Sequence, residues 1–138
     1  GEGNLVAMDS RINQSDYKRM ENDVKDALDA GQEVTVKTKL TYKDGQSERP
    51  DLIESTVTAD GQVTVYKFDN NIDGSLKSEV PENGRDIVNE KLDKTGGKVS
   101  SIKEGYDDKG NLVQTTVYVT YKGEDGSNYR VSVVIENE

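Results

Sequence analysis

The residues from Asp69 onward match half of the pattern of a calcium-binding loop. Asp69, Asn71 and Asp73 occupy the first, third and fifth positions of helix–loop–helix calcium sites, where oxygen side chains ligate the ion. The twelfth position should hold a bidentate glutamate, but it is Val80, and Glu79 comes one residue early. The segment before Asp69 also has the pattern of a strand and not of a helix. We interpret the stretch either as a weak Ca²⁺ site or as a polar loop with Asx turns.

The absence of two residue types removes several kinds of site chemistry. The 138 residues include no cysteine and no histidine. Without cysteine there are no disulfides, no zinc–thiolate sites and no thiol catalysis. Without histidine the chain lacks the commonest general base near neutral pH and the commonest ligand of transition metals.

The charge of the chain bears on the partners it suits. The net charge is −9 and the pI is about 4.6. A non-specific nucleic-acid binder usually shows a basic face, because phosphate neutralisation supplies most of its affinity. An acidic chain instead suits plain solubility, a cation or a basic partner protein. No apolar run approaches the ~18 residues needed to span a membrane, and no signal peptide is present.

The stretch NLVAMDSRINQSDYKRMEND, residues 4–23, is the most informative in the chain. Taken by themselves, its residues have ordinary structural roles. Asn13 is typical of a helix cap, Tyr17 of a core position, and Glu21 of a solvated helix position. The spacing of the three residues places them on one helix or at its start.

This stretch nonetheless resembles the core of the bacterial DNA/RNA non-specific endonuclease family. More closely, it is similar to the nuclease toxins that Gram-positive bacteria export through type VII secretion systems. Further matches lie at Arg49-Pro50-Asp51, at Asp60-Gly61 and at Phe68-Asp69-Asn70, so the resemblance covers residues 4–70. It implies a secreted bacterial protein whose substrate is nucleic acid.

The family uses a ββα-metal finger, in which a histidine activates water and Mg²⁺ stabilises the charge that develops on phosphate. By this resemblance, Asn13 stands where the metal-binding asparagine belongs, and Glu21 where a glutamate orders metal-bound water. A neutral amide ligand leaves the full charge of the ion available as a Lewis acid. Asn4 and Arg49 are the residues that the resemblance places near the substrate, Arg49 as a phosphate contact.

The chain departs from the family at the catalytic base. The family's histidine motif precedes the matching stretch, whereas this chain starts at Gly1 without it. Carboxylates such as Asp9, Asp16 or Glu21 are poor substitutes. We therefore assign no catalytic residue and expect little or no nuclease activity from this polypeptide alone. The alternative is a non-catalytic acidic module that reuses the toxin fold for protein binding or inhibition, with a cognate toxin or immunity protein as partner.

The apolar pattern predicts the elements that position these residues. Helical spacing predicts helices over residues 15–30 and 85–94, and alternation predicts strands at 33–42, 52–59, 62–69, 98–105, 112–122 and 128–136. Asp60-Gly61 predicts a two-residue hairpin turn. We expect an α+β fold in which a helix followed by a three-stranded antiparallel meander occurs twice. The predicted organisation is a nuclease-toxin-like portion (1–70), a linker (71–83) and a second module of unknown role (84–138), whose meanders either pair edge to edge or pack separately.

Overall fold

The fold is built on one antiparallel sheet. The computed structural model describes residues 14–42, 51–69 and 75–137. The elements in chain order are α1 (Gln14–Asp29), β1 (Val34–Thr41), β2 (Leu52–Ala59), β3 (Gln62–Asp69), the 3₁₀ turns η2 (Ser75–Glu79) and η3 (Glu82–Gly84), α2 (Arg85–Thr95), β4 (Lys98–Tyr106), β5 (Leu112–Lys122) and β6 (Asn128–Glu136). The six strands lie in sequence order. The predicted α+β class and antiparallel pairing are confirmed, and β3 pairs with β4, so the two meanders join edge to edge.

Local residue chemistry explains where these elements end. Asp60 and Gly61 have positive φ angles of 50° and 83°, and they connect Ala59 to its paired neighbour Gln62. Two consecutive positive φ angles characterise the tight hairpin turn that the sequence predicts. At the end of α2, Gly96 adopts a left-handed φ of 69°, and its N–H donates to the carbonyl of Leu92. Glycine takes this conformation without the steric cost of a Cβ.

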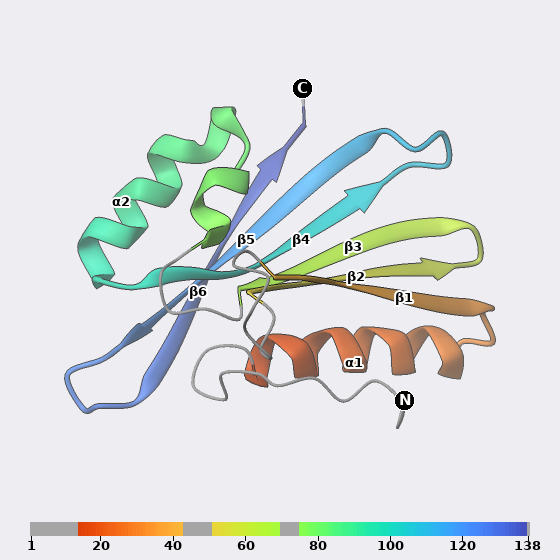
Figure 1. The fold of residues 1–138 in the computed structure, drawn as a ribbon, viewed down its shortest axis with the longest axis horizontal. Helices are drawn as coiled ribbons and strands as arrows, with labels where there is room; N and C mark the ends of the chain where they lie inside the picture. Colours follow the sequence, from red (N-terminus) through yellow and green to blue (C-terminus); the bar gives the residue numbers. More distant parts are fainter. Residues whose placement is uncertain (1–13, 43–50, 70–74, 138) are drawn as a thin grey trace.

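The two helices cover opposite faces and opposite halves of the sheet. Phe68 of β3 packs in a cluster with Met20 of α1, whereas Ile102 of β4 packs in a cluster with Val88 of α2. Phe68 pairs with Ser101, the residue next to Ile102, and successive strand residues point to opposite faces. We call these faces the α1 face and the α2 face. In Figure 1, α1 runs beside β1 to β3, and α2 lies with β4 to β6.

Each helix therefore has its own hydrophobic cluster. The cluster on the α1 face consists of Met20, Ile53, Val57, Tyr66 and Phe68. The cluster on the α2 face consists of Leu76, Val80, Val88, Val99, Ile102, Val117, Val119, Val133 and Ile135. Polar side chains of β4 and β6 contact α1 at Asp16 and Asp23, beside its apolar cluster. Within the described ranges, neither helix has the length and apolar composition of a membrane-spanning segment.

The stretch predicted as a linker contributes to the core. Leu76 in η2 and Val80 just after it are fully or almost fully buried in the α2-face cluster. Lys67 of β3 also forms ion pairs with Glu79 of η2 and Glu104 of β4, at 2.8 and 3.2 Å. Leu76 and Val80 thus pack this segment against the sheet, although most of its residues are polar. The division into separate domains stays a prediction.

Candidate functional site

Most of the residues predicted to form a site lie outside the described part of the chain. These residues are Asn4, Asn13, Arg49, Asn71 and Asp73. Their proposed roles in binding metal or substrate therefore stay predictions. The structure does place the remaining candidates, Glu21 and Asp69.

Asp69 is completely buried at the end of β3. Its Oδ2 atom lies 3.3 Å from the Nζ atom of Lys98 in β4. The lysine ammonium supplies there the positive charge that a bound cation would otherwise supply. Within the described ranges, no three histidine, cysteine, aspartate or glutamate side chains gather as a metal site would require. Because two of the three predicted Ca²⁺ ligands fall outside these ranges, the calcium loop stays a prediction.

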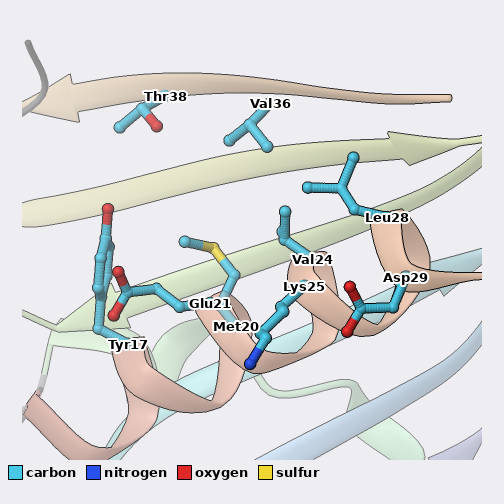
Figure 2. Close-up of a pocket in the computed structure, with 9 residues that line it drawn as sticks. All are labelled: Tyr17, Met20, Glu21, Val24, Lys25, Leu28, Asp29, Val36 and Thr38. Atoms are coloured by element: carbon cyan, nitrogen blue, oxygen red, sulfur yellow. The ribbon is translucent and has the colours of Figure 1, made fainter. Parts of the chain in front are cut away.

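Glu21 lies on the exposed side of α1, at a groove between this helix and β1. The groove has a volume of about 350 Å³. Figure 2 shows the side chains that line it, which are Tyr17, Met20, Glu21, Val24, Lys25, Leu28, Asp29, Val36 and Thr38. The helical members recur every three or four positions, and the two strand residues are two positions apart, so each set shares one face. The groove thus presents two carboxylates, those of Glu21 and Asp29, and the ammonium of Lys25 beside an aromatic hydroxyl and an apolar floor.

Charge and burial in the groove act together on Tyr17. Partial burial raises the pKa of the Tyr17 hydroxyl, and the nearby negative charge of Glu21 raises that pKa further. The phenol therefore stays protonated well above neutral pH. In this state it can donate a hydrogen bond, but it cannot serve as a base near neutral pH.

The groove borders an open strand edge. Among the described residues, β1 pairs only with β2, so its other edge has no strand neighbour. Val36 and Leu28, which face the groove, are exposed by 42% and 55% of their surfaces. An unpaired edge beside exposed apolar side chains can accept a further extended segment.

The opposite side of α1 binds to strands of the second half of the chain. Asp16, in the first turn of α1, is buried and forms an ion pair with Arg130 of β6 at 2.5 Å. The hydroxyl of Ser100, at an irregular position of β4, donates to the second carboxylate oxygen of Asp16 at 2.7 Å. Thr120 of β5 lies within hydrogen-bonding distance of Ser100, at 2.6 Å. Polar groups of β4 and β6 thus contact one buried carboxylate of α1 directly, and Thr120 of β5 supports the contact through Ser100.

Two guanidinium groups lie on the ring of Tyr118. The Cζ atom of Arg19 in α1 is 5.1 Å from the ring centroid, and that of Arg130 is 5.5 Å from it. Arg19 is exposed, whereas the ring of Tyr118 is almost buried. Both distances are within the range of cation–π attraction.

About two turns further along α1 than Asp16, Asp23 forms a second polar contact with the sheet. Its Oδ2 atom accepts hydrogen bonds from the Tyr66 hydroxyl at 2.8 Å and from the Lys103 ammonium at 3.3 Å. Burial, followed by the hydrogen bond to Asp23, raises the pKa of Tyr66 far above its usual value. α1 is therefore held by carboxylates at both Asp16 and Asp23.

Sequence reasoning missed this second side of α1. The only signal was in β6, where Tyr129, Val131, Val133 and Ile135 alternate and so place Arg130 on the other face. Nothing in the sequence links Arg130 to Asp16, which lies 114 positions earlier. Only the joined sheet brings them together.

Comparison with known proteins gives one match. The sequence model of the DNA/RNA non-specific endonuclease family matches residues 1–61, a segment that includes α1, β1 and β2. No curated protein and no solved structure matches the chain. The family match supports the resemblance seen in residues 4–23, and the N-terminal part of the chain is therefore similar to the non-specific endonucleases.

Proposed function

We propose that this chain is part of, or diverged from, a Mg²⁺-dependent non-specific DNA/RNA endonuclease, of the toxin type that bacteria secrete. The observation that carries the proposal is the family match over residues 1–61. Its support from geometry is the position of Glu21, which is exposed on α1 at the edge of a groove. A carboxylate in such a position remains accessible to an ion and its bound water.

The residues proposed for the metal have suitable chemistry. Asn13 and Glu21 offer an amide oxygen and a carboxylate, and Mg²⁺ prefers oxygen ligands while keeping several waters. Mg²⁺ bound there would stabilise negative charge on a phosphate group. The carboxylate of Glu21 would orient water, as the resemblance implies. Asn4 and Arg49 would lie near the substrate.

We further propose that these 138 residues alone cleave nucleic acid little or not at all, because they contain no histidine. A general base would have to come from another segment or another chain. Metal binding does not need this base, so it can be tested separately from cleavage. This separation determines the design of the experiment.

We would measure Mn²⁺ binding by electron paramagnetic resonance, together with digestion of plasmid DNA and RNA in Mg²⁺ or Mn²⁺. We expect Mn²⁺ to bind, and Glu21→Gln to weaken binding by about tenfold, as loss of a group that orders metal-bound water typically does. Asn13→Ala should weaken it at least as much. Glu124→Gln, in the exposed turn between β5 and β6, removes the same charge and should leave Mn²⁺ affinity unchanged.

The outcomes separate the components of the proposal. If none of the variants changes Mn²⁺ affinity, the metal assignment is wrong. If the chain digests nucleic acid and Asn13→Ala abolishes this activity, the metal site works with a base other than histidine, and the expected inactivity is wrong. Metal binding without digestion is the result that we expect.

A second candidate is a non-catalytic protein-binding or inhibitory module. One support is the sheet, which continues from β1 through β6 without a gap. The other is the net charge of −9. This candidate predicts that neither Mn²⁺ nor nucleic acid binds, and that a basic protein such as a cognate toxin does. Titration with an immobilised nuclease toxin of high pI would test it by measured affinity.

A further inference from the structure

Arg19 in α1 carries a positive charge that no carboxylate neutralises within the described ranges. Arg130 is matched by Asp16, and Lys103 is matched by Asp23. Arg19 forms no ion pair with a described carboxylate, and it lies on the ring of Tyr118. An aromatic ring orients a guanidinium group while leaving its charge intact.

The arrangement also restricts the position of Arg19. Tyr118 is almost buried, and both Arg19 and Arg130 lie against its ring, with Cζ atoms 5.1 and 5.5 Å from the centroid. Arg130 is itself fixed by the buried carboxylate of Asp16. An arginine that is oriented in advance loses less conformational entropy when it binds a ligand than a freely moving one does. Arg19 thus combines exposure, full charge and a preset orientation.

We propose that Arg19, held on Tyr118, binds the backbone phosphates of a nucleic-acid strand. The planar guanidinium fork matches two phosphate oxygens. The neighbouring Lys18 is also exposed and adds positive charge to the same turn of α1. The inference rests on the proposed function for its choice of nucleic acid, since α1 lies in the segment that matches the endonuclease family. Tyr118 and Arg130 lie outside that segment, so the second half of the chain supplies the support for this contact.

The test is the affinity for a short, fluorescently labelled single strand of DNA or RNA, measured by anisotropy in EDTA. Without metal, neither cleavage nor the metal site affects the result. Arg19→Gln should weaken binding by about tenfold at low salt and reduce the salt dependence by about one counterion. Lys109→Gln, in the exposed turn between β4 and β5, removes one charge elsewhere and should have a much smaller effect.

Two substitutions at Tyr118 distinguish the effect of orienting Arg19 from the effect of its charge. Tyr118→Phe retains the ring and should bind the strand as the unchanged chain does. Tyr118→Leu removes the ring while leaving Arg19 in place, and it should weaken binding several-fold. Circular dichroism verifies that each variant folds. Arg19→Gln alters only an exposed side chain, so it decides the question even if Tyr118→Leu does not fold.

Each result has a definite meaning. If the unchanged chain binds the strand and Arg19→Gln binds equally well, the inference is wrong while the proposed function stands. If the unchanged chain binds neither DNA nor RNA in EDTA, the inference is wrong, whereas the proposed function is decided by the separate measurement of Mn²⁺ binding. If Arg19→Gln abolishes binding to polyglutamate but not to nucleic acid, the partner is an acidic protein and the inference is again wrong.

Discussion

A buried ion pair between Asp16 and Arg130 joins the two halves of the chain. Only 1% of the Asp16 side chain and 24% of the Arg130 side chain are exposed. A carboxylate in such a site depends on its partner, because burial without compensation carries a large desolvation cost. Ser100 contributes a hydrogen bond to the same carboxylate but no opposite charge. The pair therefore sets the position of the first turn of α1.

We predict that Arg130→Met lowers the free energy of unfolding by about 3 kcal/mol, because it leaves Asp16 buried and unpaired. Urea denaturation measures the change. Asp16→Asn in the same chain should recover part of the loss. As a control, Lys94→Met breaks the exposed pair with Glu90 and should hardly affect stability. Equal losses for Arg130→Met and Lys94→Met would contradict the structural role of the buried pair.

At the scale of elements, the start of β4 lies very close to the backbone of β5. A Cβ atom added to Gly97 would overlap the carbonyl oxygen of Thr120. This approach allows the chain to pass directly from the end of α2 into the sheet. The obstructing atom belongs to the backbone of β5, so β5 could not move away without disturbing its pairing with β4.

We predict that Gly97→Ala destabilises the protein by about 2 kcal/mol through this overlap. Gly105, within β4, is the control. A Cβ atom there would lie 3.8 Å from the carbonyl oxygen of Gln114, which is an ordinary contact. Gly105→Ala should be neutral or stabilising, because alanine restricts the unfolded chain more than glycine does. Thermal unfolding of the two variants compares them directly, and equal effects would refute the backbone clash.

At the scale of the whole molecule, groups that titrate at high pH lie where elements meet. Tyr66 joins β3 to α1, Lys67 joins β3 to η2 and β4, and Tyr17 lies between α1 and β1. The pKa values of all three are raised. Burial is the first cause for the tyrosines, whereas hydrogen bonds to Glu79 and Glu104 outweigh burial for Lys67. Folding thus favours the protonated form of each group.

We predict that the protein loses stability as the pH rises above about 10, the usual pKa of tyrosine. A raised pKa in the folded state contributes stability that is present below the unfolded pKa and disappears as the pH increases through the folded value. Urea denaturation between about pH 8 and about pH 11 measures the loss. Tyr66→Phe should make the decrease shallower. Stability that stays constant or increases over this range would contradict the prediction.

The separate elements were predictable because their causes are local. Spacing of apolar residues and the Asp60-Gly61 turn predicted the strands 52–59, 62–69, 112–122 and 128–136 with the bounds that the structure has. The predicted start of the second helix at Arg85 is also correct, and the helix ends at Thr95, one residue later than predicted, with Gly96 as its C-cap. Periodicity and turn chemistry act within a few residues of chain, so they can be read from the sequence directly.

The candidate site was predictable only in part. The resemblance indicated Glu21, and the structure places it at an exposed groove. The structural roles of Asp16, Tyr118 and Arg130 were not predicted, because these roles arise from contacts between distant parts of the chain. Leu76 and Val80 were likewise hidden in a stretch that is polar on average.

By itself, the sequence determined the α+β class, most of the elements and the similarity of the N-terminal part to non-specific endonucleases. The tertiary structure alone decided that β3 pairs with β4, that α1 and α2 cover opposite faces, and that Arg130 reaches Asp16. The physical reason is the range of the interactions. Hydrogen bonds within a helix or hairpin depend on neighbours in the chain, whereas the pairing of sheet edges and the burial of charges depend on which distant surfaces exclude water together.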